Sequence, residues 1–80
     1  SDEPMVVEST KVTLSNSVNG SYNFQTKFTT IPNVQISAQP SDDAQGMVNI
    51  FITSLTTNSV TFETSAPFSG IVHIQIIKIG

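Results

Sequence analysis

The side chains in this sequence that could do chemistry are few. Asp42 and Asp43 form the one acidic pair in the body of the chain, within the turn-forming run 40–46. Carboxylates accept hydrogen bonds from sugar hydroxyls, and hard cations prefer oxygen ligands, so the pair could hold a sugar or a cation. No Glu follows at the place that a calcium loop requires, and a solvated turn is the alternative interpretation.

His73 is the one histidine, and Cys is absent. A single imidazole excludes sites that need two, and the missing thiols exclude disulfides, thiolate metal sites and Cys nucleophiles. Eleven Ser residues are present, but none lies in the Gly-x-Ser-x-Gly turn that exposes a hydrolase nucleophile. We therefore expect no enzyme, no catalytic residue, no metal and no cofactor.

The polar excess of the chain is uncharged. Ser, Thr, Asn and Gln supply 32 of the 80 residues, whereas Lys supplies three, Arg none, and Asp and Glu six, for a net charge of −3. This balance argues against binding to nucleic acid or to an anionic membrane, and no apolar run approaches the roughly 20 residues of a membrane span. Such surfaces are common on secreted and virion proteins, so we expect an extracellular or virion-surface location.

The elements that must position these groups are strands. Val, Ile and Thr account for 27 of the 80 residues, whereas Leu occurs twice. β-branched side chains are restricted in helices and pack well on sheets, and apolar residues here recur at every second position. We expect an all-β fold, a six-stranded antiparallel β-sandwich with strands at 10–15, 21–29, 33–39, 46–55, 59–65 and 71–79.

Turn signals separate the expected strands. Asn19-Gly20 is the pair preferred in two-residue hairpins and predicts a turn there. Residues 40–46 and 66–70 contain Pro, Gly and Ser and are expected to be loops. Residues 1–9 mix acids with Pro4 before the first alternating run. We expect them to be an N-terminal arm or linker that leads into one domain over residues 10–80.

The last expected strand is apolar on both faces. A strand buried on both faces needs a cover on each, and one small domain can cover only one of them with its own core. A chain of 80 residues also buries only about 60% of its unfolded surface, so a second copy is the simplest cover. The side chains expected between copies are Phe51, Ile71, His73, Gln75, Ile77 and Ile79.

Residues 22–37 carry a spacing of rings, Pro and aliphatic side chains that resembles the H-type lectin domain family, found in snail agglutinins and slime-mould discoidins and similar to modules at phage fibre tips. The positions are Phe24, Phe28, Pro32, Val34 and Ile36. Residues 57–62 and 74–80 are also similar to family segments. The resemblance implies a six-stranded sandwich that assembles as a homotrimer, with a sugar held in a groove between subunits.

The resemblance also suggests ligand-binding positions. The Arg that many members carry on the fourth strand falls near Asn49, and a Trp-His segment falls near Phe68. These two residues join Asp42 and Asp43 as candidates for ligand binding. Phe68 could be an apolar shelf for a sugar, or a lid over the end of the sandwich. Asn49 shares the second face of its strand with Phe51, so that face is either the interface or the groove beside it.

In a trimer, His73 and Gln75 would form a polar stripe near the threefold axis. Repulsion between protonated imidazoles would then weaken the assembly below about pH 6. An exposed His73 on an outer face is the alternative.

The sequence thus predicts a carbohydrate-binding module, the C-terminal receptor-recognition tip of a trimeric fibre or surface protein. The start at Ser1 suggests a piece of something longer. The alternative is a structural trimerisation knob without a ligand. In the groove between subunits, a lectin should present amides or carboxylates beside an aromatic ring, whereas a knob should fill that groove with aliphatic side chains.

Overall fold

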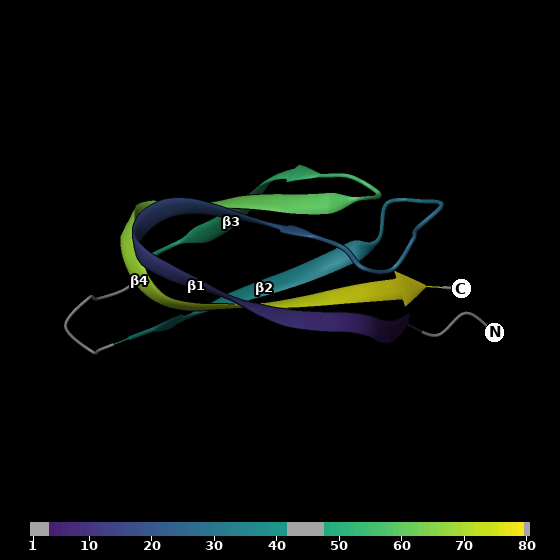
Figure 1. The fold of residues 1–80 in the computed structure, drawn as a ribbon, viewed down its shortest axis with the longest axis horizontal. Coiled ribbons are helices and arrows are strands. Elements are labelled where there is room, and N and C mark those ends of the chain that lie inside the picture. The colour runs from purple at the N-terminus through teal and green to yellow at the C-terminus, as the bar shows by residue number, and fades with distance from the viewer. Residues whose placement is uncertain (1–3, 42–47, 80) are drawn as a thin grey trace.

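The protein is an antiparallel all-β structure, as its composition predicts. The structure is a computed structural model that describes residues 4–41 and 48–79, and every regular element in those ranges is a strand. The strands are β1 (Pro4–Asn23), β2 (Asn33–Pro40), β3 (Ile50–Leu55) and β4 (Ser59–Ile79). β4 pairs antiparallel with each of the other three (Figure 1). The described residues contain no helix that could cross a membrane.

Two strands are long and bent, which is why the structure has four strands where the sequence predicts six. β1 has 20 residues and β4 has 21, and each contains two of the expected strands or parts of them. The bend in β1 lies at Asn16, where φ is 49°, and the pairing register shifts between Leu14 and Asn19. The bend in β4 lies at Gly70, where φ is 152°. The Asn16 N–H donates to Ser69 Oγ over 2.8 Å and joins the two bends.

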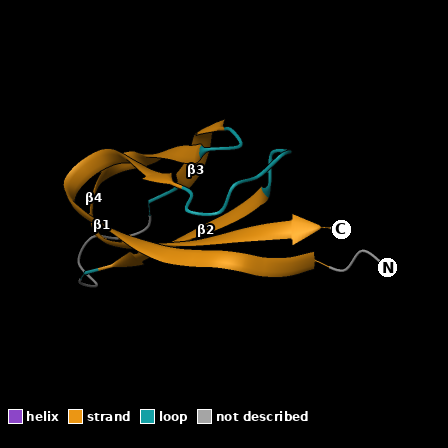
Figure 2. Cartoon of the chain, turned by 45° about the vertical axis from the view of Figure 1, so that its right-hand side comes forward, coloured by secondary structure: helices purple, strands orange, loops and turns teal. Residues whose placement is uncertain are grey.

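The bends fold the sheet over into two layers (Figures 1 and 2). In the first, here the β2 layer, residues 70–79 of β4 lie between β2 and residues 4–14 of β1. In the second, here the β3 layer, residues 59–64 of β4 lie between β3 and residues 19–23 of β1. Each layer therefore has three strand segments, and β1 and β4 pass through both.

The core lies between the layers. Val60 and Phe62 of the β3 layer and Val72, Ile74 and Ile76 of the β2 layer are fully buried. They occupy alternate positions of β4, as the period of a strand requires, and full burial of one such side chain contributes about 1.5–3 kcal/mol to stability.

The Asn19-Gly20 pair lies inside β1 and does not form the predicted hairpin, since Gly20 pairs with Phe62 across the ladder. A Cβ at Gly20 would lie 2.6 Å from Phe62 Cζ, so the glycine is needed for close packing against a buried ring. Gly70 is needed for a second reason, because its φ of +152° strains any side chain and a Cβ would lie 2.2 Å from the carbonyl oxygen of Gln39.

Three further boundaries differ from expectation. Residues 4–9, expected as an arm, belong to β1 and pair with residues 75–79 of β4. Residues 66–70, expected as a loop, lie inside β4, where Phe68 pairs with Ser17. Residues 24–29, expected to continue a strand, lie outside β1 and begin a long connection to β2.

Candidate functional site

Of the four predicted ligand-binding residues, the structure describes Asn49 and Phe68. Asp42 and Asp43 lie outside the described residues. Asn49 is exposed, and its backbone N–H donates to Ser65 Oγ over 2.9 Å, which anchors the segment before β3. Phe68 is 1% exposed and packs in the core. This burial corrects the expectation of a surface shelf and favours the lid, because a ring without an exposed face cannot stack on a sugar.

The residues predicted between copies are divided over two opposite outer faces. Ile71, His73, Gln75 and Ile77 alternate with the buried residues of β4, so they line the outer face of the β2 layer. Phe51 is 46% exposed and pairs with Glu63 on the outer face of the β3 layer. For Ile79 the structure gives only the strand position. Phe51 and His73 therefore lie on different outer faces of the chain.

Ile71, His73, Gln75 and Ile77, here called the β4 stripe, form a row on the outer face of the β2 layer that is polar at its centre. His73 Nε2 lies 2.7 Å from Gln39 Oε1, within hydrogen-bond distance. Lys11 of β1 and Ser37 of β2 flank His73, and shallow hollows lie on both sides of it. Ile71 and Ile77 lie further along the same face.

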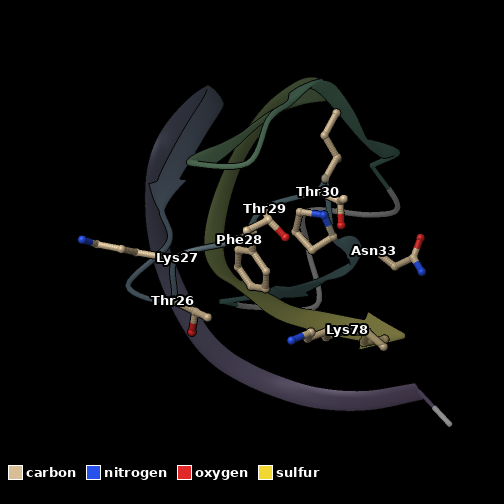
Figure 3. A pocket seen from close by; sticks show the side chains of 10 residues that line it. Thr26, Lys27, Phe28, Thr29, Thr30, Asn33 and Lys78 are labelled. Carbon is tan, nitrogen blue, oxygen red and sulfur yellow. The ribbon is translucent and has the colours of Figure 1, made fainter. Parts of the chain in front are cut away.

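Two clefts that the sequence analysis missed flank the connection between β1 and β2, here loop 24–32. The first is the lysine cleft, a hollow of about 210 Å³ lined by residues 26–33, Ile77 and Lys78 (Figure 3). Its lining includes the hydroxyl-bearing residues Thr26, Thr29 and Thr30 together with Phe28.

The second, the amide cleft, is a wider hollow of about 510 Å³ lined by residues 23–28 and Asn58. Asn23, Gln25 and Asn58 bring side-chain amides to it, and the Phe24 and Phe28 rings supply apolar surface. Thr26, Lys27 and Phe28 line both clefts, so the two hollows share one wall. Together they form a surface of amides, hydroxyls and rings along a single loop.

Glu8, on the segment of β1 that belongs to the β2 layer, holds loop 24–32 in place. Its carboxylate accepts the backbone N–H of Thr26 at 2.9 Å, that of Gln25 at 3.0 Å, and the hydroxyl of Tyr22. Glu8 lies next to a register shift of β1 between Val6 and Glu8. Such a bulge re-aims a side chain, and here the carboxylate reaches the loop.

The same contacts set the protonation of Glu8. Partial burial by itself raises the pKa of the carboxyl group, but the hydrogen bonds from Tyr22, Gln25 and Thr26 outweigh it and lower the pKa from 4.5 to about 2. The carboxylate in turn raises the pKa of Tyr22, mainly by accepting a hydrogen bond from its hydroxyl, and burial of the phenol adds to the effect. Glu8 is therefore ionised across the neutral range and holds the loop as a charged acceptor.

Three aromatic rings in edge-on contact lead from the Glu8–Tyr22 hydrogen bond to the clefts. Tyr22 meets Phe24 edge-on, with centroids 6.2 Å apart, and Phe24 meets Phe28 edge-on at 5.4 Å. Such pairs add about 0.5–1.5 kcal/mol beyond the burial of area, so these contacts fix the orientation of Phe28 at the shared wall. The sequence predicts a strand for all three rings, and Tyr22 lies on β1, whereas Phe24 and Phe28 lie in loop 24–32. The Thr-Thr pair before Ile31-Pro32 is the local signal that favours a loop there.

The clefts are lined by polar and aromatic side chains. Their described lining contains no carboxylate, no imidazole and no thiol that could act as an acid, a base or a nucleophile. Within the described ranges no three acidic or imidazole groups lie close enough to hold a metal ion. The clefts can donate and accept hydrogen bonds and can offer ring surface to an apolar face.

Comparisons of the chain with models of protein families, with curated proteins and with solved structures find no match.

Proposed function

We propose that this chain is a carbohydrate-binding module that recognises a glycan along loop 24–32. The observation that carries the proposal is the shared wall of the two clefts, where amide and hydroxyl groups stand beside the Phe24 and Phe28 rings. Sugar hydroxyls need both donors and acceptors, which amides and hydroxyls supply, and the apolar face of a sugar ring packs on an aromatic ring. The sequence predicts amides beside a ring in the groove between the subunits of a lectin, and here the same combination lies along loop 24–32 of one chain.

The rest of the surface is compatible with the same function. The net charge is −3, and Arg is absent, so phosphate-rich partners are disfavoured. The proposal includes membership of the H-type lectin family, an extracellular or virion-surface location, and a place at the tip of a fibre or surface protein. Its support is the antiparallel all-β fold and the block of residues 22–37.

A homotrimer is part of the proposal, with the β4 stripe toward the threefold axis. The supporting observation is the apolar surface at one end of this face, where Val6 is 51% exposed and pairs with Ile77. The same surface favours the second candidate function, a trimerisation knob with no ligand. The two candidates differ in the clefts, because a knob has no use for amides beside rings.

A glycan array followed by titration calorimetry tests the proposal. The wild-type chain should bind a defined set of glycans, and Asn58→Ala and Gln25→Ala should weaken that binding about 5- to 20-fold by removing amides from the amide cleft. Both substitutions keep the backbone N–H and C=O groups, including the Gln25 N–H that Glu8 accepts. Asn19→Ala is the matched control, because Asn19 is exposed on the outer face of the β3 layer.

Two results would contradict glycan binding. One is an array without signal for a folded wild-type chain. The other is equal affinity for the wild-type protein and the Asn58→Ala and Gln25→Ala variants, with melting temperatures unchanged. An array without signal from a protein that is trimeric by light scattering would leave the knob as the better account.

A further inference from the structure

The positive charge of this chain is concentrated at one cleft. The sequence has three Lys and no Arg, and Lys27 and Lys78 both line the lysine cleft. No carboxylate belongs to the lining of that cleft in the described part of the chain. A chain of net charge −3 therefore places two of its three cationic side chains beside one hollow.

The two lysines are oriented differently. Figure 3 shows the Lys78 side chain running toward Thr26, with its amine beneath the Phe28 ring. The Lys27 side chain extends away from the cleft. Lys78 can therefore touch a molecule in the cleft, whereas Lys27 adds positive potential at the rim.

The nearest carboxylate that the structure describes around this wall is already occupied. Glu8 accepts the Thr26 N–H from behind, together with Gln25 N–H and the Tyr22 hydroxyl. Its charge is met by these donors and it does not line the cleft. Among the residues that the structure describes, no acidic side chain is therefore left to pair with Lys78, and its amine can meet an anion that comes from outside.

We infer that the lysine cleft binds a carboxylate-bearing sugar residue, with Lys78 as the counter-charge to the carboxylate. The inference rests on the proposed glycan binding and names its ligand class. A hollow of about 210 Å³ lies below the roughly 300 Å³ at which drug-sized sites begin, so it suits one sugar residue. The ring of that residue lies against Phe28, its hydroxyls meet Thr26, Thr29 and Thr30, and the chain of neutral residues continues into the amide cleft.

Matched saccharides test this ligand class. The probes are a neutral β-linked glucose oligosaccharide and the oligosaccharide of the same length that ends in glucuronic acid. The wild-type protein should bind the acidic one about 5- to 10-fold more tightly, because a charge-assisted hydrogen bond at a partly exposed site is worth little more than that. The preference should shrink as salt rises from about 0.05 M to about 0.5 M. Sodium acetate in excess tests whether a carboxylate alone suffices, and it should not compete.

The variants separate the local charge from the net charge. Lys78→Gln should abolish the preference for the acidic oligosaccharide, so that this variant binds the two oligosaccharides with equal affinity. Lys11→Gln removes the same charge at the His73 face of the β2 layer and should keep the preference. Equal losses in the two variants would overturn the inference, since net charge would then explain both.

The outcomes distinguish this inference from the proposed function. Equal binding of both oligosaccharides by the wild-type protein would overturn the acidic preference and leave glycan binding standing. Competition by acetate would also overturn it, because the site would then be a general anion site. Absence of binding to either oligosaccharide and to every glycan of the array would overturn both.

Discussion

Thr26 donates its backbone N–H to Glu8 Oε1 over 2.9 Å, across 18 residues of sequence. This bond connects β1 of the β2 layer to the wall shared by the two clefts. Loop 24–32 has no strand partner of its own over residues 24–29, so its position depends on contacts of this kind. The relationship makes Glu8 a positioning residue for the proposed binding surface.

Removal of the Glu8 charge should destabilise the protein. Glu8→Gln keeps the shape of the side chain but loses the charged acceptor for two N–H groups and one hydroxyl, and we expect a loss of about 1–3 kcal/mol in the free energy of unfolding at pH 7. Urea denaturation measures it. Glu63→Gln is the control, because Glu63 is exposed, and it should change stability by less than about 0.5 kcal/mol. Equal effects of the two substitutions would contradict the role of Glu8.

The low pKa of Glu8 predicts a loss of stability in acid. A carboxyl group whose pKa is lower in the folded protein than in the unfolded chain stabilises the fold above the unfolded value. Its contribution should therefore be complete above about pH 4.5 and disappear as the pH falls toward about 2. Urea midpoints of the wild-type protein and Glu8→Gln should converge over that interval. A difference that stays constant from pH 7 to pH 2 would speak against it.

Tyr22 offers a direct spectroscopic reading of the same contact. It is the single Tyr of a chain without Trp, so ultraviolet absorbance follows its ionisation alone. Because the hydrogen bond to Glu8 raises the pKa of Tyr22, the folded protein should titrate above the ordinary value of 10.0. In Glu8→Gln the midpoint should move back toward that value. A wild-type midpoint at or below 10.0 would show that the contact does not persist in solution.

Substitution of the two strand glycines should be costly for different reasons. Gly70→Ala places a Cβ 2.2 Å from the Gln39 carbonyl oxygen at a φ of +152°, and we expect a loss of about 2–4 kcal/mol. Gly20→Ala meets the Phe62 ring at 2.6 Å and should lose about 1–3 kcal/mol. Thermal unfolding compares them with Ser21→Ala, an exposed neighbour on β1. A neutral Gly20→Ala would contradict the requirement for a glycine beside the Phe62 ring.

Opposite outer faces allow a clean test of the proposed trimer. Ile71→Lys places a charge on the β4 stripe, whereas Phe51→Lys places the same charge on the outer face of the β3 layer. Light scattering should give three times the 8.6 kDa chain mass for the wild-type protein and for Phe51→Lys, and a smaller mass for Ile71→Lys. A monomeric wild-type protein would contradict the proposed trimer. Dissociation of the Phe51→Lys variant would show that the outer face of the β3 layer belongs to the interface.

The sequence by itself determined the fold class and most of the inner faces. β-branched residues dominate, and the alternation of Val72, Ile74 and Ile76 placed them on one buried face, as the structure confirms. The expected strand at 33–39 agrees with β2 within one residue. These features follow from propensity and from a period of two, which are local properties of the chain.

Only the tertiary structure decided where the strands continue and which contacts hold loop 24–32. Asn19-Gly20 has the sequence of a turn, but its conformation is set by the buried Phe62 ring 42 residues away. The sequence predicts an arm over residues 1–9, yet Glu8 lies on β1 and accepts the N–H groups of Gln25 and Thr26. Bends, bulges and cross-layer contacts depend on register between distant segments, and local patterns carry no information about that register. For the same reason the two clefts became visible only when loop 24–32 met the C-terminal end of β4 and Asn58.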